Sequence, residues 1–325
     1  KYGYEQLVYL HDRHSGLKGI ICIHNTTLGP ALGGTRVWEY ENEDDAVYDV
    51  LRLARGMTKK AACAGLNLGG GKAVIIGNSK QLRKDTVRRE AFWRAFGRYI
   101  EGLGGRYITA EDVGTSPEDM TLVRMETNHV LGLPTTSGDP SPFTAYGVYK
   151  GIKACLKEEF GSAKLEGIKI AVSGVGHVGS SLCEMLAKEG AILTISDIDE
   201  ESTKRVSELT GAKVVKPEEI YDVDCDVFAP CALGAVINDN TLSRLKCKII
   251  AGCANNVLED SQKHGTMLHE MGLVYAPDYV INAGGLINVY QERIGYNKEA
   301  SMAAIDLIFD RVREIIRESK DSNTP

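Results

Sequence analysis

The sequence predicts an α/β fold in two domains, the second of which has a doubly wound parallel sheet. The chain has 325 residues, which suits two domains of ~150 residues each. A stretch with three prolines and one glycine, Leu133–Pro142, interrupts the chain and can extend neither a helix nor a central strand. We therefore expect domains at residues 1–135 and 136–325, with the last helix a candidate to pack back towards the first domain.

Two amphipathic helices and three strands are predicted in the first domain. Apolar residues recur at Val47, Val50, Ala54 and Met57, which is the spacing of one helical face. Apolar runs bounded by glycine or turn residues predict the strands. The helices are expected at Asp44–Ala64 and Arg88–Gly102, and the strands at Gly19–His24, Lys72–Ile76 and Tyr107–Ala110.

In the second domain, helix and strand patterns follow one another in turn. Helices are expected at Thr144–Glu159, His177–Glu189, Glu200–Thr210 and Ser301–Arg317, and strands at Lys169–Ser173, Ile192–Ile195, Val227–Ala229, Ile249–Ala251 and Val274–Ala276. Such alternation is typical of a parallel sheet with helices on both faces.

Composition excludes several classes of protein. Hydrophobic residues make up 43% of the chain and charged residues 25%, as in ordinary globular proteins and unlike disordered or fibrous ones. With 38 Lys and Arg against 44 Asp and Glu, the net charge is −6, so nothing favours binding to nucleic acid or to a membrane surface. No apolar run approaches the ~20 residues of a membrane span. We expect a soluble, cytoplasmic protein.

No metal site is predicted. None of the eight cysteines forms a C-x-x-C pair, and thiols scattered through apolar stretches behave as small hydrophobic groups in a reducing compartment. His264 and His269 are five residues apart, off the four-residue spacing that places two metal ligands on one helix face. We expect both histidines to lie on the surface.

A G-x-G-x-x-G pattern predicts a dinucleotide site in the second domain. It follows a predicted strand, opens a predicted helix, and precedes Asp197 by 23 residues counted from its first glycine. In this context the glycines give a tight turn, close approach of the pyrophosphate and close helix packing, while the helix start attracts phosphate. The carboxylate of Asp197 can accept the ribose hydroxyls and repel a 2′-phosphate, which favours NAD over NADP. The residues of the pattern are Gly174, Val175, Gly176, His177, Val178 and Gly179, and we expect His177 to be a variable surface residue.

The first domain carries three candidates for catalysis. Lys60 ends the first helix, and Lys72 follows three consecutive glycines twelve residues later. Two buried lysines at one site disfavour each other's charge, so one can act as a general base while the other holds a carboxylate. Taken singly, each lysine is better explained as a solvated charge at the end of an element. Asp112 follows the strand Tyr107–Ala110, and the pattern leaves open whether it is catalytic or caps a helix at Ser116–Met125.

Several segments resemble the Glu/Leu/Phe/Val dehydrogenases, from near Tyr4 to at least Glu318. They are RLARGMTKKAACAGLNLGGGKAVI (Arg52–Ile75), RYITAEDVGT (Arg106–Thr115), FAPCALGAVIN (Phe228–Asn238), APDYVINAGGLINV (Ala276–Val289) and TLGPALGGTR (Thr27–Arg36). The last of these is most similar to the leucine dehydrogenase branch of the family.

The resemblance implies reversible oxidative deamination of an L-amino acid to its 2-oxo acid and ammonium, with NAD as the cofactor. It implies that Lys60 and the backbone amides of Gly33 and Gly34 bind the substrate carboxylate. Lys72 then serves as general base, with Asp112 as its partner, in a cleft that closes between the domains. It further implies a homo-oligomer, an octamer in the leucine enzymes. Thr144, Gly234, Asn255 and Asn256 match positions at the nicotinamide end, Asn282 lies beside the substrate amine, and Met57 belongs to the substrate pocket.

The same resemblance places an apolar pocket around the substrate side chain, lined by Leu32, Ala110, Leu286 and Val289. With no charge to meet a glutamate side chain, such a pocket favours branched-chain amino acids, leucine first and also valine and isoleucine. Leu286 stands where leucine dehydrogenases often have a smaller valine, which leaves pocket depth open and keeps phenylalanine or valine dehydrogenase as alternatives. A non-catalytic NAD-binding sensor is the alternative from another class of protein.

Overall fold

The computed structural model describes residues 3–133 and 137–325. The chain divides into two compact units. Unit 1 comprises Lys1–Asp139 and Val289–Asn297, and unit 2 comprises Pro140–Asn288 and Lys298–Pro325. The domain boundary expected at residues 135/136 lies outside the described residues. The α/β class and the two-domain organisation are confirmed.

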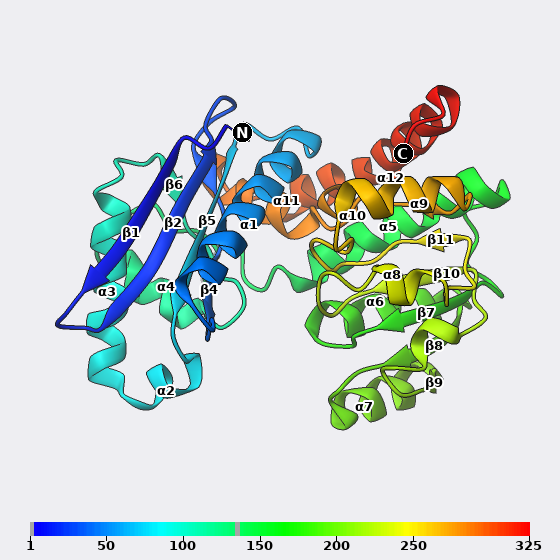
Figure 1. The fold of residues 1–325 in the computed structure, drawn as a ribbon, viewed down its shortest axis with the longest axis horizontal. Coiled ribbons are helices and arrows are strands. Elements are labelled where there is room, and N and C mark those ends of the chain that lie inside the picture. Colours follow the sequence, from blue (N-terminus) through cyan, green and yellow to red (C-terminus); the bar gives the residue numbers. More distant parts are fainter. Residues whose placement is uncertain (1–2, 134–136) are drawn as a thin grey trace. The chain divides into compact units, whose positions relative to one another are not determined.

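Unit 1 is built on a six-stranded mixed sheet of order β1-β2-β5-β3-β6, with β4 also paired to β5 (Figure 1). The pairs β1/β2 and β2/β5 are antiparallel, whereas β3 and β4 run parallel to β5. The strands are β1 (Gln6–Asp12), β2 (Leu17–Asn25), β3 (Ala31–Leu32), β4 (Thr35–Trp38), β5 (Gly69–Ile76) and β6 (Tyr107–Ile108), and the helices are α1 (Glu43–Cys63), α2 (Ser79–Lys84), α3 (Thr86–Glu101) and α4 (Pro117–Arg124).

Alternate residues of the central strands pack on different helices, because successive side chains of a strand point to opposite faces. On one face, Ile20, Cys22 and Val74 form a cluster with Ala46, Val50 and Ala54 of α1. On the other face, Ile21, Ile23, Ala73 and Ile75 pack with Phe92, Trp93 and Phe96 of α3. By the same alternation, Lys72 of β5 lies on the α1 face of the sheet.

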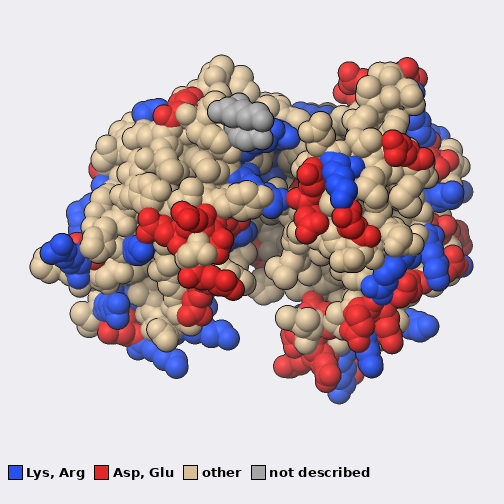
Figure 2. Space-filling model, viewed as in Figure 1, with Lys and Arg blue, Asp and Glu red and all other residues tan. Residues whose placement is uncertain are grey.

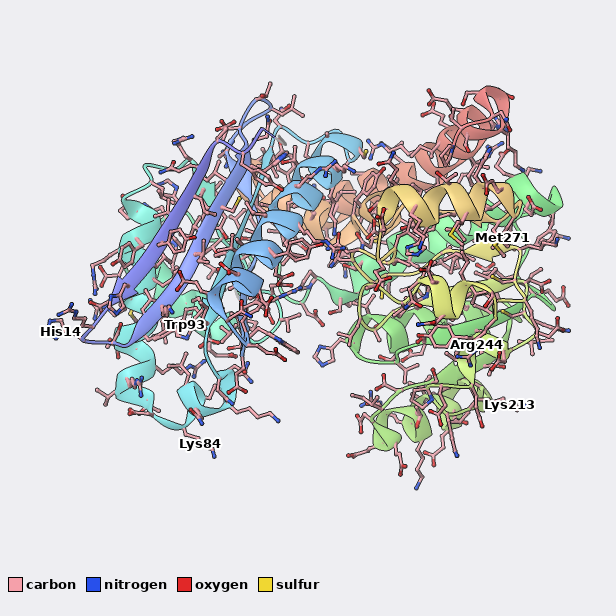
Figure 3. The ribbon with its side chains drawn as sticks, viewed as in Figure 1. His14, Lys84, Trp93, Lys213, Arg244 and Met271 are labelled. Atoms are coloured by element: carbon pink, nitrogen blue, oxygen red, sulfur yellow. The ribbon has the colours of Figure 1, made fainter. Side chains whose placement is uncertain are left out.

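The core beneath α3 is centred on Trp93, which is labelled in Figure 3 and is 1% exposed. Its ring makes edge contacts with Phe92 and Phe96, at centroid distances of 5.4 and 6.0 Å. Burying aromatic side chains of this size stabilises the fold by several kcal/mol, at roughly 25 cal/mol per Å². This packing fixes the sheet on which the candidate catalytic residues stand.

Unit 2 contains a six-stranded sheet of order β12-β11-β10-β7-β8-β9, in which every pair is parallel. Strand order reverses between β7 and β10, and ligands of doubly wound sheets bind at the carboxyl end of the strands at such a point. The elements are α5 (Ser141–Phe160), β7 (Lys169–Ser173), α6 (His177–Lys188), β8 (Ile192–Ser196), α7 (Glu200–Thr210), β9 (Lys213–Val214), η1 (Ile220–Asp222), β10 (Val227–Pro230), α8 (Asp239–Leu242), β11 (Ile249–Ile250), α9 (Ser261–Glu270), β12 (Val274–Tyr275), α10 (Asp278–Ile281), α11 (Gly284–Ile294) and α12 (Lys298–Ser322).

The expectation that His264 lies on the surface is wrong, because its side chain is only 1% exposed. Its Nδ1 accepts a hydrogen bond from the backbone N–H of Asp260 at 3.0 Å, and its Nε2 lies 3.2 Å from Asp239 Oδ1. The ring therefore joins the starts of α8 and α9. His269 is half-buried, whereas His177 is exposed as expected.

Charged side chains of both signs are interspersed on the face of the molecule drawn in Figure 2, in keeping with a net charge of −6. None of the helices in the described residues is long and apolar enough to cross a membrane. The eight cysteines are free thiols, and five of them are buried, namely Cys22, Cys155, Cys183, Cys225 and Cys247.

Candidate active site

The centre of the candidate site in unit 1 is an ion pair between Lys72 and Asp112. Lys72 Nζ donates a hydrogen bond to Asp112 Oδ2 at 2.6 Å. The lysine side chain is 7% exposed and the aspartate side chain 22% exposed. A charged pair so little exposed needs close geometry to offset its loss of hydration. The two residues that the sequence singled out, forty positions apart, are thus brought into direct contact.

Glycines permit the close packing of backbone around this pair. A Cβ on Gly70 would lie 2.1 Å from the backbone nitrogen of Thr58 in α1, and a Cβ on Gly71 would lie 2.9 Å from the Tyr107 ring. A Cβ on Gly34 would lie 2.8 Å from the Cβ of Asp112. Gly70 and Gly71, which precede Lys72, therefore let α1 and β6 approach β5.

The two glycines of the Gly33–Gly34 pair differ in their hydrogen bonding. The Gly33 N–H donates to Ile108 O at 3.1 Å, so it is already used, and its expected role as a donor to a carboxylate is corrected. No hydrogen bond from the Gly34 N–H is present among the residues that the structure describes. Of the two amides, that of Gly34 is the one available to a substrate oxygen.

Asp112 is held in place by a turn and does not cap α4. The N-cap of α4 is Ser116, whose side chain accepts a hydrogen bond from Asp119 N. Of the two roles that the sequence left open for Asp112, that of a helix cap is therefore excluded. Thr115 Oγ1 accepts from Asp112 N at 2.8 Å and donates to Asp112 O at 2.7 Å. Burial raises the pKa of the Asp112 carboxyl, but the charges of Lys72 and Arg36 outweigh it and hold that pKa below its usual value. Asp112 is therefore ionised and acts as a counter-ion.

A second cation, Arg36 of β4, extends the ion pair into a network. Arg36 Nε lies 3.6 Å from Asp112 Oδ2, and Arg36 Nη1 donates to Asp49 Oδ2 of α1 at 2.9 Å. The Tyr40 hydroxyl donates to the same Asp49 oxygen at 2.7 Å. The guanidinium thus joins two carboxylates, one of which is the partner of Lys72.

The remaining candidates for substrate binding surround this network or lie on α11. Lys60 and Met57 are half-buried on the last two turns of α1, the helix that packs along β5. Leu32 and Ala110, at 3% and 7% exposure, are buried close to the ends of β3 and β6. Leu286 and Val289, at 8% and 6% exposure, are three positions apart and so share one face of α11.

In unit 2, the three glycines of the fingerprint have the distinct environments that a dinucleotide requires. Gly174 has a φ of +103°, which only glycine adopts without strain. A Cβ on Gly176 would meet nothing within 4 Å, whereas a Cβ on Gly179 would lie 2.1 Å from Gly174 O. The loop is therefore open to a ligand at Gly176 and closely packed at Gly179. The first turn of α6 begins at His177 and presents free N–H groups there.

Asp197, just after β8, is tied to the same loop. Its Oδ2 accepts from Val175 N at 2.7 Å and its Oδ1 accepts from Asp199 N at 3.0 Å. Each carboxylate oxygen keeps a second lone pair for a ribose hydroxyl. The glycine loop and the acidic residue thus fit a dinucleotide, which the protein would hold through Gly176, Val178 and Asp197. The N–H of Val175 is already used by Asp197 and its side chain is buried, so its expected direct contact with the cofactor is corrected.

The residues expected at the nicotinamide end gather around the carboxyl ends of β10 and β11. A Cβ on Gly234 would lie 2.6 Å from Asn255 O, and Ala235 N donates to Asn256 O at 2.8 Å. Asn282 Nδ2 donates to Asn255 Oδ1 and to Cys253 O, both at 2.9 Å. The Oδ1 of Asn282 is buried and has no hydrogen-bond partner among the described residues. Thr144 of α5 packs on the start of α11, where a Cβ on Gly285 would lie 2.6 Å from its Oγ1.

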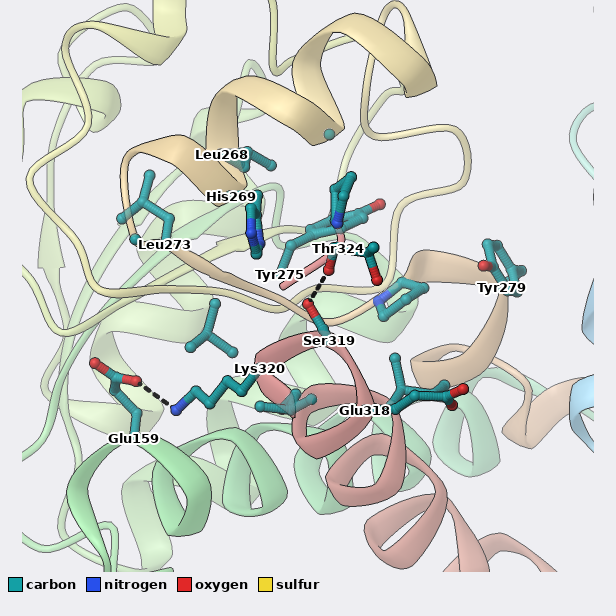
Figure 4. A pocket seen from close by; sticks show the side chains of 17 residues that line it. Glu159, Leu268, His269, Leu273, Tyr275, Tyr279, Glu318, Ser319, Lys320 and Thr324 are labelled. Atoms are coloured by element: carbon teal, nitrogen blue, oxygen red, sulfur yellow. Dashed lines mark hydrogen bonds and ion pairs between the residues drawn. The ribbon is translucent and has the colours of Figure 1, made fainter. Parts of the chain in front are cut away.

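A cavity of about 470 Å³ in unit 2 lies apart from these residues (Figure 4). It is lined by α9, β12 and the end of α12, with Leu268, His269, Tyr275 and Ser319 among its walls. None of the residues predicted for catalysis or for dinucleotide binding lines it. The candidate site is therefore defined by its side-chain contacts and not by this cavity.

Sequence reasoning missed Arg36, Asp49 and Tyr40. Arg36 ends the segment Thr27–Arg36, and the glycine pair stands three and two residues before it. This proximity to Gly34 could have nominated Arg36 for the same site. Asp49 lies in α1, where an acidic side chain is ordinary for the polar face of an amphipathic helix and gives no sign of a special role. Only the three-dimensional contacts reveal that α1 contributes a carboxylate to this network.

Comparison with known proteins adds family evidence to this geometry. The model of the "Glu/Leu/Phe/Val dehydrogenase, dimerisation domain" matches residues 5–129, and the model of "Glutamate/Leucine/Phenylalanine/Valine dehydrogenase" matches residues 192–319. A leucine dehydrogenase of Thermoactinomyces intermedius is 57% identical over 328 residues, covering 100% of this chain and 88% of that protein. A phenylalanine dehydrogenase of Lysinibacillus sphaericus is 46% identical, covering 97% of this chain and 84% of that protein.

A solved structure agrees with this relationship. L-tryptophan dehydrogenase from Nostoc punctiforme superposes with a TM-score of 0.82 at 46% identity, covering 99% of this chain and 92% of that chain. Both family models and relatives that match nearly the whole chain point the same way. The chain therefore belongs to the Glu/Leu/Phe/Val dehydrogenase family of nicotinamide-dependent amino acid dehydrogenases.

Proposed function

We propose that this protein catalyses the reversible, NAD-dependent oxidative deamination of a branched-chain L-amino acid, leucine first, to its 2-oxo acid and ammonium. The observation that carries the proposal is the buried contact of 2.6 Å between Lys72 Nζ and Asp112 Oδ2. It occurs in a chain that is 57% identical to a leucine dehydrogenase over its full length. A sensor that only binds NAD has no need of this pair.

In this mechanism the substrate carboxylate is bound by the Lys60 ammonium and the Gly34 N–H. Asn282 Oδ1, buried without a partner among the described residues, accepts a hydrogen bond from the substrate amine. When bound, NAD accepts a hydride from the substrate Cα. Lys72, as general base, takes a proton from the substrate ammonium and releases it to solvent before the second step. Neutral again, it takes a proton from the water that adds to the resulting iminium carbon and returns it to the nitrogen, which leaves as ammonia when the 2-oxo acid forms. Asp112 stabilises the protonated form of Lys72 between these steps.

Leu32, Ala110, Leu286 and Val289 are proposed to contact the substrate side chain. All four are buried apolar residues, and burying a leucine side chain stabilises a complex by ~1.5–3 kcal/mol, whereas a buried unpaired carboxylate is penalised. This supports an aliphatic substrate over glutamate. The relatives named for phenylalanine and tryptophan make an aromatic substrate the second candidate.

NAD is proposed over NADP because Asp197 stands after β8 with both its carboxylate oxygens already accepting backbone N–H groups. The carboxylate is thereby fixed at the place where a ribose is expected. A 2′-phosphate there would face a negative charge, which is unfavourable by electrostatic repulsion.

The test is a substrate panel in which NADH or NADPH formation is followed at alkaline pH. We expect kcat/KM for L-leucine, L-isoleucine and L-valine to exceed that for L-phenylalanine, L-tryptophan and L-glutamate, and NAD to be preferred to NADP. A higher kcat/KM for L-phenylalanine would favour the aromatic alternative. NAD binding without turnover of any of the six amino acids would reject the enzymatic proposal in favour of a sensor.

We further propose a homo-oligomer, an octamer as the resemblance to the leucine enzymes implies. Its support is the match of residues 5–129 to a dimerisation domain. Light scattering coupled to size-exclusion chromatography tests it, since eight chains of 35.4 kDa each separate clearly from two or four.

A further inference from the structure

The network around Asp112 contains a cation to which the proposed mechanism assigns no task. Lys72 Nζ and Arg36 Nε both face one atom, Asp112 Oδ2, at 2.6 and 3.6 Å. Arg36 is held from its other side by Asp49, to which Tyr40 also donates. Its side chain is 21% exposed, so solvent screens its charge only in part.

A general base at this position has an electrostatic problem. The Asp112 carboxylate alone favours the charged ammonium of Lys72 and opposes the loss of its proton. A base that takes a proton from substrate or water first has to be neutral. A second positive charge beside the same carboxylate oxygen offsets the effect of Asp112, because like charges disfavour each other.

We propose that Arg36 is a positioning residue of this site, which fixes the Asp112 carboxylate against Lys72 and whose positive charge promotes proton loss from the Lys72 ammonium. The inference rests on the proposed function for its kinetic consequences only. Arg36 touches neither Lys72 nor, in the proposed mechanism, the substrate, and it acts through Asp112. Asp49 sets how much of its charge is felt, because it neutralises the guanidinium in part.

Three other titratable groups near the network carry no charge in the pH range of interest. Burial raises the pKa of Cys22, which pairs with Lys72 across β2 and β5, to about 12. Burial also raises the pKa values of Tyr40 and Tyr107. These three groups stay neutral between pH 6 and 10.

Two further groups carry or change charge in that range. Lys60, in the last turn of α1, is a cation expected to be occupied by the substrate carboxylate. Burial, with the nearby charges of Asp139 and Glu118, raises the pKa of Glu111 to about 7. Glu111 is therefore the group whose titration has to be separated from that of Lys72.

The experiment measures kcat/KM for L-leucine with NAD from pH 6 to 10.5 in the full-length chain. We expect Arg36→Gln to move the acidic limb of the profile to higher pH by about one unit, the lower end of the shift from a charge ~4–6 Å away. Arg36→Lys keeps the charge and should lie between the wild type and Arg36→Gln. Asp49→Asn, which leaves the Arg36 charge uncompensated, should move the limb to lower pH.

Arg89→Gln is the matched control. Arg89 is also 21% exposed and pairs with a buried carboxylate of unit 1, Asp119, at 2.7 Å, but it does not contact the network. We expect this variant to leave the profile in place even where it lowers the melting temperature. Repeating the Arg36→Gln comparison in a Glu111→Gln background removes the other titrating carboxyl, and the shift should persist.

A second readout needs no turnover. Trace acetylation of Lys72 by acetic anhydride, quantified by mass spectrometry at a series of pH values, reports directly how much of the Lys72 amine has lost its proton. The midpoint should move upward in Arg36→Gln and downward in Asp49→Asn. If Arg36→Gln fails to fold, Arg36→Lys and Asp49→Asn decide the question by the same two readouts.

Unchanged midpoints and limbs in the folded Arg36 and Asp49 variants, with kcat lowered evenly at all pH values, would overturn the inference and leave Arg36 a structural residue. A wild-type chain that oxidises no amino acid would instead reject the proposed function. The labelling midpoints would then still decide what Arg36 does to Lys72.

Discussion

Individual charges decide the chemistry at the residue scale. Lys72 is buried on the α1 face of the sheet, and its ammonium meets Asp112 at 2.6 Å. Around it stand a cation, Arg36, and a carboxyl, Glu111, whose pKa burial raises to about 7. Substitutions of this lysine and of this glutamate test the two roles separately.

Lys72→Ala should reduce kcat by at least ~10²-fold, the size of a lost general base, while the dissociation constant for NAD stays unchanged. The glycine loop and Asp197 belong to unit 2, whereas Lys72 belongs to unit 1. Turnover is measured from NADH absorbance, and binding from the NADH fluorescence titration. Lys18→Ala, which removes a half-exposed lysine paired with Glu43, is the control. A variant that retains wild-type turnover removes Lys72 from the mechanism.

Glu111→Gln should stabilise the protein at alkaline pH and have little effect at acidic pH. Burial, aided by Asp139, Glu118, Asp112 and Asp119, raises the Glu111 pKa from 4.5 to about 7. The folded state then binds a proton that the unfolded state releases, so this group's contribution to stability falls as the pH rises from about 4.5 through about 7. A neutral amide avoids that loss.

We expect the melting temperature of Glu111→Gln to exceed that of the wild type by about 2–4 °C at pH 8.5, which corresponds to ~1 kcal/mol. The difference should vanish at pH 5. Glu184→Gln, at an exposed position of α6, should show no such pH dependence. Equal melting temperatures of Glu111→Gln and wild type at both pH values contradict the assignment.

At the scale of elements, two glycines of the turn between β7 and α6 are expected to have different roles, one in stability and the other in ligand binding. Gly179→Ala places a Cβ 2.1 Å from Gly174 O and should cost ~1–3 kcal/mol through overpacking. Gly176→Ala places a Cβ in open space at a φ of −66°, so its effect on stability should stay within ~0.5 kcal/mol. Its methyl group nevertheless projects where the pyrophosphate is expected to approach.

These two variants are therefore expected to affect different properties of the protein. Gly176→Ala should raise the dissociation constant for NAD without changing the melting temperature, and Gly179→Ala should lower the melting temperature. Denaturation and NAD titration of both proteins provide the comparison. If Gly176→Ala binds NAD as the wild type does, the dinucleotide does not approach at that residue.

The elements also show what a sequence can and cannot reveal. Helix α1, which has a long apolar stripe, was predicted within a residue of its ends, because periodicity depends on local sequence only. The short strands β3 and β4 have two and four residues, too few for alternation to be visible. They flank the glycine pair and form because β5 offers each of them a partner.

The site divides in the same way. Lys72, Asp112 and the glycine loop carry recognisable motifs, so the sequence could nominate them. Arg36, Asp49 and the bond from Gly33 N–H to Ile108 O depend on contacts between distant segments. His264 was misassigned for that reason, since its two partners lie at the starts of different helices.

At the scale of the whole molecule, α11 belongs to both compact units. Its residues up to Asn288 fall in unit 2, whereas Val289–Asn297 fall in unit 1. Within unit 1, both carboxylate oxygens of Glu292 accept from Gly132 N at 3.2 Å, and Glu292 also accepts from Ser137 N at 3.1 Å. Gly132 and Ser137, which precede unit 2 in the chain, are thus bound by a residue that follows most of unit 2.

Glu292→Ala should loosen the backbone at Gly132 and at Ser137, because it leaves the N–H donors of two buried residues without an acceptor, at a cost of ~1–3 kcal/mol. Hydrogen exchange of the amides of Gly132 and Ser137 should become faster, while exchange in the β7–β8 core of unit 2 stays slow. Glu299→Ala, at an exposed position of α12, is the control. An unaltered exchange rate at the Gly132 amide would show that Glu292 does not hold this residue in place.

The split of α11 has a consequence for how such proteins exchange parts during evolution or in the laboratory. A chimaera joined at residues 139/140 would combine the first 139 residues of one parent with Val289–Asn297 of the other. We call Val289–Asn297 the strap, because it returns from unit 2 to complete unit 1. The acceptor at position 292 and its donors would then come from different parents. Crossovers that transplant the strap together with the first 139 residues keep these partners together, and libraries built on that rule should yield more folded members.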